Sequence, residues 1–564
     1  MFWADKVVEE IIKSGKYKPY WVDDMFTPSG FAHVGSLRGP LVHDAVYRSL
    51  RDANCKATWT YVMNDFDPID GLPPELMEKF EKYLGIPLRM VPSPEEGFDT
   101  FADFYSKDIQ KTLRTLGVEA KFLSSWDMYK AGKFNDAIKT ALNNSEKILD
   151  IYQKVSGSKK REKGWLPLQV ICEKCGKLGT TRVHDWDGKT VEYTCEPEMV
   201  KWAKGCGYTG RISPFDGNGK LPWKVDWPAH WKVLGVTIEG AGKDHSSAGG
   251  SRDIAKALCD EVFNYPNPFN IPYEFFLIGG KKMASSKGLG LKARDLTKLL
   301  PPEVGRFLFT RTDYRKAIEF DPVNTMAIPN LFDEYQKAAD AYFDKGDADL
   351  ARIFEMTKIG EEFPKPPKIR FSVLAQWIQM PNMEEQIKKE NLEEWAKYAK
   401  IWIEKYAPES EKFNIKKDLP EQAKNLNEKQ KEFLVKVSEE LEKQWAAENF
   451  QKRIYEISKE LGIPSKDAFS AIYLSLIGKD HGPKAGWIVL SLNKDFVKKR
   501  FSEAQNITND RKQETRSIKK LNKPDIFFID KDLKNRFPSI SIGVATIKGV
   551  EIRKSETALE KEKE

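Results

Sequence analysis

The chain has 564 residues, a length typical of three or four domains, and 40% of its residues are hydrophobic and 31% charged. This balance provides enough apolar material for several cores and excludes collagen-like, mucin-like and fully disordered proteins. Lys and Arg number 91 against 84 Asp and Glu, so the net charge is +7, a mild excess that is compatible with a polyanionic partner. No apolar run has the length of a membrane helix, and the acidic residues near the start do not fit a signal peptide, so we expect a cytoplasmic protein.

The first 119 residues have the pattern of half of a doubly wound α/β domain. Apolar residues at helical spacing predict a short helix over 3–13, and an apolar run predicts a strand at 20–22. A glycine-containing loop, a helix over about 37–50 and a strand at 57–63 follow. This order is typical of a Rossmann-type nucleotide-binding fold.

The loop after the first strand contains Pro28-x4-His33-Val34-Gly35-Ser36. A loop of this kind at a helix N-terminus suits phosphate, because unpaired N–H groups and the helix dipole face the ligand. It has neither the Lys-Ser/Thr pair of a Walker A segment nor the three glycines of a dinucleotide fingerprint. It resembles the His-Ile-Gly-His signature of class I aminoacyl-tRNA synthetases, in which the imidazole contacts ATP phosphates. For His33 alone, a capping or core role is the simpler interpretation, so a second signature is needed.

A second signature follows a predicted strand at 271–278. Residues 279–288 read Gly-Gly-Lys-Lys-Met-Ala-Ser-Ser-Lys-Gly, which resembles the Lys-Met-Ser-Lys-Ser loop of the same family in its Lys-Met-Ser-Ser-Ser-Lys variant. A bare lysine-rich segment would be a solvated turn, but two signatures in this order favour an ATP-using synthetase. The resemblance implies catalytic roles for His33, Lys282 and Lys287, with ATP and Mg²⁺ as cofactors. The implied ATP site comprises His33, Gly35, Ser36, Lys282, Met283, Ser285, Ser286 and Lys287.

Residues 120–225 interrupt the α/β pattern and form a predicted insertion. Four cysteines in it form a predicted structural Zn²⁺ site: Cys172, Cys175, Cys195 and Cys206. Four thiolates suit tetrahedral zinc and leave no open position for chemistry. The first pair has the Cys-x2-Cys spacing of a zinc knuckle, whereas the second pair is less specific, so His184 is an alternative ligand. Four unligated reduced cysteines are the remaining alternative.

Residues 226–324 return to the α/β pattern. A Trp-rich segment at 223–231 is followed by Glu239-Gly-Ala-Gly-Lys-Asp-His245 and by Gly-Gly-Ser at 249–251. This run resembles class I lysyl-tRNA synthetases, and glutamyl- and glutaminyl-tRNA synthetases lack it. The resemblance extends over residues 15–505 and implies a lysine–tRNA ligase, which activates L-lysine as lysyl-adenylate and transfers it to the 3′-terminal adenosine of tRNA(Lys). The implied lysine site comprises Thr27, Trp223, Glu239, His245 and Tyr273, with Glu239 as the anion for the substrate ammonium.

The last part of the chain has two different patterns. Residues 325–505 are predicted to be an all-α domain, and the resemblance implies that it binds the tRNA anticodon. Residues 506–564 read as a linker and a small tail with strands at 526–529 and 540–547. We therefore expect a monomer with an α/β catalytic domain in two halves (1–119 and 226–324), a zinc insertion, a helical domain and a β-containing tail.

Three residues depart from the family pattern. Ser36 replaces the second histidine of the first signature, Ala284 removes a hydroxyl from the second, and Met25 stands where a small residue is usual. Three other functions stay open at this point: a catalytically silent RNA-binding paralogue, a free-standing nucleotidyltransferase and a synthetase for glutamate. Retention of His33 and both lysines argues against the first, and a zinc insertion with a large helical region argues against the second. A glutamate pocket should present arginine rather than Glu239.

Overall fold

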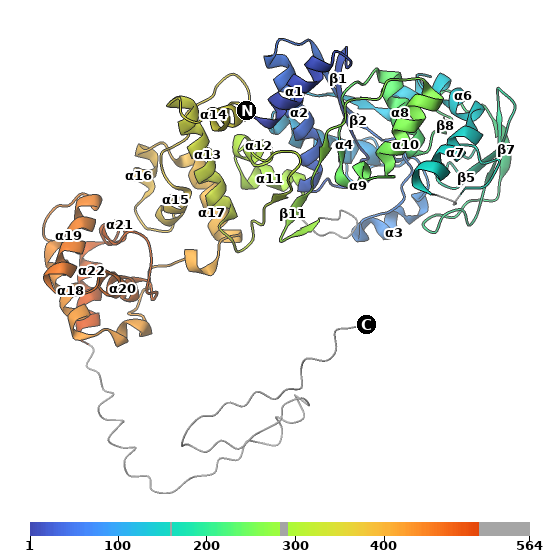
Figure 1. Cartoon of the computed structure of the whole chain (residues 1–564). Coiled ribbons are helices and arrows are strands. Elements are labelled where there is room, and N and C mark those ends of the chain that lie inside the picture. The colour runs from blue at the N-terminus through green and yellow to red at the C-terminus, as the bar shows by residue number, and fades with distance from the viewer. Residues whose placement is uncertain (158–160, 283–290, 507–564) are drawn as a thin grey trace, which may run out of the picture. The chain divides into compact units, whose positions relative to one another are not determined.

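The structure is a computed structural model that describes residues 1–157, 161–282 and 291–506 (Figure 1). Met283, Ser285, Ser286 and Lys287 of the second signature, Ala284 and the predicted tail strands lie outside the described residues. The chain divides into two units, residues 1–505 and 506–564, and the description below concerns the first.

A parallel sheet forms the centre of the N-terminal half. Its strands are β1 (Tyr20–Phe26), β2 (Ala57–Met63) and β3 (Lys121–Ser124), in the order β1-β2-β3. Helices α2 (Arg38–Asp52) and α4 (Phe101–Thr115) lie between successive strands in the chain. Helix α1 (Trp3–Ser14) precedes the sheet and ends at Gly15, whose φ of 66° is the left-handed conformation that glycine adopts easily. The predicted helix–strand–loop–helix–strand order is therefore confirmed.

The second half of the α/β fold joins the sheet beside β1. Ile238 forms parallel bridges with Val22 on one side and Phe269 on the other. Helices α8 (Trp223–Leu234), α9 (Lys243–Ser246) and α10 (Ser251–Leu258), which runs into a π-helical turn, accompany this segment. The predicted strand at 271–278 is two short strands, β10 (Pro272–Tyr273) and β11 (Phe276–Ile278), because they pair with different partners. β10 pairs with β9 (Ala241–Gly242), and β11 pairs with β12 (Lys281–Lys282) and β13 (Ile318–Glu319).

The segment between these halves contains small helices followed by short strands. After β3 come α5 (Ser125–Lys130), α6 (Asn135–Asn143) and α7 (Ser145–Ser156), whereas the short helix α3 (Met77–Phe80) lies earlier, between β2 and α4. An antiparallel sheet then has the order β5-β6-β7 (Thr181–Trp186, Val191–Cys195 and Thr209–Ile212), beside the pair β4 (Gln169–Val170) and β8 (Gly219–Lys220). A separate group of buried apolar side chains, which runs from Val62 and Phe66 to Phe263, makes the core here.

Helices make up most of the described chain after β12. They are α11 (Ala293–Leu299), α12 (Pro302–Thr310), α13 (Ala327–Phe343), α14 (Ala348–Glu355), α15 (Phe371–Trp377), α16 (Glu384–Lys389), α17 (Glu393–Lys405), α18 (Glu428–Glu440), α19 (Ala447–Glu460), α20 (Ser465–Leu476), α21 (Ala485–Ser491) and α22 (Lys494–Gln505). Trp395 and Trp402 of α17 are buried, as their helical spacing predicts for a core face. Within residues 1–157, 161–282 and 291–506, no helix is both long and apolar enough to cross a membrane.

Candidate functional site

His33 caps the short helical turn that leads into α2. The backbone N–H of Ser36 donates to His33 Nδ1 at 3.1 Å, and Val34 and Leu37 of this turn, η1 (Val34–Leu37), are buried anchors. Because Nδ1 accepts this bond, the neutral ring carries its proton on Nε2, the tautomer that can donate to a phosphate oxygen. His33, Gly35 and Ser36 are all partly exposed. The first signature thus combines a histidine donor with a helix N-terminus.

Backbone hydrogen bonds hold the chain at the start of the second signature and again just past its end. On its N-terminal side, Lys281 and Lys282 form β12, antiparallel to β11. On its C-terminal side, Val34 N–H donates to the Leu291 carbonyl and Ala293 N–H to the Ala32 carbonyl, each at 2.8 Å. His33 and Lys292 consequently face each other in an antiparallel bridge. The chain that leaves the second signature is hydrogen-bonded directly to the first.

Arg38, at the start of α2, connects this helix to the end of α12 and to the segment after it. Its buried guanidinium donates to the carbonyls of Phe309 at 2.9 Å and Asp313 at 3.0 Å. Burial lowers the pKa of Arg38 to about 10, so the group stays a cation near neutral pH. Arg38 was not among the predicted site residues, because its role depends on carbonyls some 270 positions away.

The predicted lysine-site residues of the second half gather around α8 and α9. Trp223, 46% exposed, lies 5.5 Å from the exposed His245 ring, and Trp227 lies 6.1 Å from Trp223 between ring centroids. Trp227 Nε1 donates to Glu239 at 2.8 Å, and Tyr273 pairs with Gly242 in the β9–β10 ladder. An aromatic corner therefore adjoins a buried carboxylate.

Glu239 is 1% exposed, and both its oxygens accept hydrogen bonds from indoles, one from Trp227 and the other from Trp231. Burial raises the pKa of Glu239 to about 7, against the opposing effect of the indole bonds and of Arg252. Asp23 of β1, whose backbone N–H donates to the Ile238 carbonyl, carries a second buried carboxyl, whose pKa is also raised by burial and by Glu239. Because both pKa values are raised, the charged forms of these carboxyls are disfavoured, and a cation beside them would favour ionisation.

A buried polar chain links Thr27 to helix α8. Thr27 Oγ1 donates to Asp67 at 2.8 Å, Asp67 pairs with Lys220 at 2.7 Å, and Lys220 pairs with Asp226 at 3.0 Å. Tyr129 donates to the other oxygen of Asp226. The Lys220 side chain is almost fully buried, so its charge needs both carboxylates. These contacts connect the first loop to the helix that carries Trp223. The charged residues among them were not predicted from the sequence.

A second polar cluster lies between β1 and α2. Gly240 N–H donates to His43 Nε2 at 2.7 Å, and His43 Nδ1 lies 2.8 Å from the Gly39 carbonyl and 3.4 Å from an oxygen of Asp24. Burial disfavours the imidazolium and Asp24 favours it, with a net rise in the pKa of His43. The Gly240 bond nevertheless requires a lone pair on Nε2, so the ring is neutral when this bond is made. Asp23 and Asp24, adjacent in the strand, are the sequence signal that could have indicated this cluster, which was not predicted.

The four cysteines form one compact group. Their Sγ atoms all lie within 4.8 Å of one another. Cys172 and Cys206 are 3.6 Å apart and Cys175 and Cys195 are 3.7 Å apart, close to the roughly 3.8 Å between sulfurs in a tetrahedron with Zn–S bonds of about 2.3 Å. His184 lies instead 4.0 Å from Glu192. The donor set fits a tetrahedral zinc ion without a histidine.

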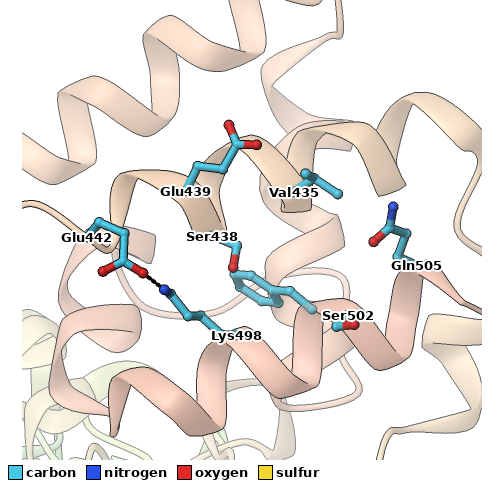
Figure 2. A pocket seen from close by; sticks show the side chains of 8 residues that line it. Val435, Ser438, Glu439, Glu442, Lys498, Ser502 and Gln505 are labelled. Carbon is cyan, nitrogen blue, oxygen red and sulfur yellow. Dashed lines mark ion pairs between the residues drawn. The ribbon is translucent and has the colours of Figure 1, made fainter.

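A cavity of about 290 Å³ opens elsewhere, between α18 and α22 (Figure 2). Val435, Ser438 and Glu439 approach it from α18, and Ser502 and Gln505 from α22. Two of its charged residues, Glu442 and Lys498, form an ion pair, and Glu442 also contacts Lys494. None of the residues that line it belongs to the predicted ATP or lysine sites.

Comparison with known proteins matches both parts of the chain. Residues 1–360 match the family described as tRNA synthetases class I (K), and residues 376–505 match an anticodon binding domain. The chain is therefore a class I synthetase catalytic domain followed by a helical anticodon-binding domain. The chain belongs to the class I tRNA synthetase (K) family.

Full-length relatives agree with this assignment. The lysine–tRNA ligase of Archaeoglobus fulgidus is 33% identical over 519 residues, covering 89% of this chain and 100% of the relative. That of Methanocaldococcus jannaschii is 35% identical over 542 residues, covering 89% and 99%. Among solved structures, a glutamate–tRNA ligase from Elizabethkingia meningosepticum aligns with a TM-score of 0.42 at 11% identity, covering 87% of this chain and all of that one.

Proposed function

We propose that the protein is an ATP-dependent lysine–tRNA ligase. The observation that carries the proposal is the pairing of the His33 turn with residues 291–293, which attaches the segment just past the second signature to the first signature. Full-length similarity to archaeal lysine–tRNA ligases supports lysine as the amino acid. The substrates are ATP, L-lysine and tRNA(Lys).

In the first step, the lysine carboxylate attacks the α-phosphorus of ATP, and pyrophosphate leaves. This chemistry depends on positioning and charge neutralisation more than on covalent help from the protein. His33 Nε2 and the N–H groups at Gly35 and Ser36 serve the phosphates, and Lys282 and Lys287 offset the charge that develops on pyrophosphate. Mg²⁺ would supply further charge neutralisation on the phosphate oxygens.

In the second step, the terminal ribose of the tRNA attacks the activated lysyl carbonyl, and AMP leaves. The helical domain binds the anticodon, with Lys and Arg on the backbone and aromatic residues against splayed bases. We assign the catalytic halves to 1–119 and 226–324, the insertion to 120–225, the anticodon domain to 325–505 and an appended tail to 506–564.

The amino acid lies in the site between β1 and the α8–α9 corner. Thr27, Trp223, His245 and Tyr273 surround it, and Glu239 contributes the negative charge that favours a cationic side chain and repels a glutamate side chain. The four cysteines would hold a structural zinc that stabilises the insertion and takes no part in the reaction.

The proposal is tested by ATP–pyrophosphate exchange with each proteinogenic amino acid, with and without tRNA. We expect exchange with lysine and none with glutamate. Exchange with glutamate alone would identify a different synthetase, and no exchange with any amino acid, with or without tRNA, would favour a catalytically silent RNA-binding protein.

A further inference from the structure

Glu239 cannot by itself complete the recognition of a substrate ammonium. It is 1% exposed, and its two oxygens already accept bonds from Trp227 and Trp231. A direct ion pair with the substrate would have to displace one of these indole bonds. The negative charge that contacts the ligand should therefore come from another carboxylate.

Asp24 is a carboxylate of this kind, and its side chain lies on the opposite face of β1 from that of Asp23. Alternation along a strand points Asp23 and Asp24 to opposite sides, and Asp24, 8% exposed, points toward α2. One oxygen of Asp24 accepts its neighbour's Met25 N–H at 2.8 Å. The other lies 3.4 Å from the imidazole of His43, which is neutral while Gly240 donates to it. Among the described residues, neither Lys nor Arg forms an ion pair with Asp24.

Gly39 has no side chain and so leaves room for this carboxylate and for the Tyr273 hydroxyl. A Cβ at position 39 would lie 2.6 Å from Asp24 Oδ2 and 2.8 Å from the Tyr273 hydroxyl, both too close for any side chain. The two oxygens therefore converge over a glycine within a helix. Burial, and then the charge of Asp24, raise the pKa of Tyr273 well above 10, so this hydroxyl stays neutral. A carboxylate and a neutral hydroxyl together suit a primary ammonium.

The distance of this cluster from the helix N-terminus fits the length of a lysine side chain. Gly39 follows the His33 cap by six residues, and helical rises of 1.5–2.0 Å per residue place it roughly 10 Å further along the η1–α2 axis. The substrate carboxylate must meet ATP at the helix N-terminus. A four-carbon stem would then carry the side-chain ammonium inward, toward Asp24.

We infer that Asp24 and Tyr273, meeting over Gly39, form the subsite that binds the side-chain ammonium of the substrate. This inference rests on the proposed function and adds the direct partner of the ammonium. Glu239 supports the subsite through its charge and does not contact the ligand.

The test compares D24N with the native chain in ATP–pyrophosphate exchange, using L-lysine and L-norleucine, which keeps the stem but lacks the ammonium. We expect kcat/KM for lysine to fall about 100-fold, mainly through KM, with the KM for ATP and the exchange with norleucine unchanged. D127N, at an exposed position of α5, is the matched control and should behave as the native chain.

Two results would overturn the inference. One is a lysine KM in D24N within about threefold of the native value, and the other is an equal loss with lysine and norleucine, which would mark Asp24 as a structural residue. If D24N does not fold, the same exchange assay is made with Y273F and with G39A. An unchanged lysine KM in either of these variants would contradict the proposed subsite. If the native chain shows no exchange with lysine, the proposed function fails first, whatever D24N does.

Discussion

The backbone N–H of Val34 donates a 2.8 Å hydrogen bond to the carbonyl of Leu291. This bond joins the residue after His33 to a residue three positions past the second signature, although 257 positions separate the two along the chain. The segment that leaves the second signature is therefore attached to the loop that carries the first. Mutations in either loop should therefore affect the same step of the reaction.

Replacing His33 by alanine should slow amino-acid activation about 100-fold or more. The loss follows from removal of one preorganised donor at the developing phosphate charge, typically worth roughly 3 kcal/mol. The KM for lysine should change little, and ATP–pyrophosphate exchange measures both. H481A, at an exposed histidine between α20 and α21, is the control and should exchange normally. Native-like exchange in H33A would remove His33 from the mechanism.

Replacing Lys220 by methionine should destabilise the protein by about 3 kcal/mol or more, because Asp67 and Asp226 would be left buried without their cation. The lysine KM should rise as well, since Asp67 also holds Thr27. Urea unfolding and exchange kinetics measure the two effects. K13M removes an exposed i,i+4 pair with Glu9 and should cost less than about 1 kcal/mol. Equal unfolding midpoints for K220M and K13M would refute the stabilising role of the polar contacts between Asp67, Lys220 and Asp226.

The purified protein should contain about one equivalent of zinc, and C175S should lose most of it. Because the ion would close the loops of the insertion, the variant should also unfold at lower temperature. Metal analysis and calorimetry measure this, with C55S, at a half-buried cysteine outside the cluster, as the control. Less than about half an equivalent in the native protein would argue against a structural zinc site.

Glu239 gives stability a definite pH dependence. Its pKa of about 7 in the folded protein lies above the ordinary 4.5, so the folded state binds this proton more tightly than the unfolded chain. The resulting stabilisation is complete below about pH 4.5 and is lost as the pH rises through 7. E239Q should therefore lose less stability than the native chain between about pH 5 and pH 8, as urea midpoints would show. E361Q, at an exposed position, is the control. If the stability of E239Q depends on pH in the same way as that of the native chain and of E361Q, Glu239 is not the source of the pH dependence.

Local patterns predicted much of the catalytic fold. Apolar spacing located α1, β1, α2 and β2, because each of these elements buries one face along a continuous stretch of chain. It predicted one strand at 271–278 where there are two, because β10 and β11 are separated by a change of pairing partner that only the tertiary structure determines.

The candidate site also contains some residues that local sequence predicts and others that only the tertiary structure brings together. His33 could be found because a capping histidine and its helix N-terminus are adjacent in sequence. Asp24, Gly39 and Tyr273 could not be brought together from sequence, since they come from a strand, a helix and a distant β-pair. Lys220 was missed for a similar reason, because both of its carboxylate partners are set by packing of the insertion against α8.

The most direct test of the account is transfer of labelled amino acid to tRNA by the native chain in the presence of ATP. We expect labelled lysine to become attached to the 3′-terminal adenosine of tRNA(Lys), and labelled glutamate to remain free. Absence of lysyl-tRNA under conditions where a known lysine–tRNA ligase charges the same tRNA would contradict the account.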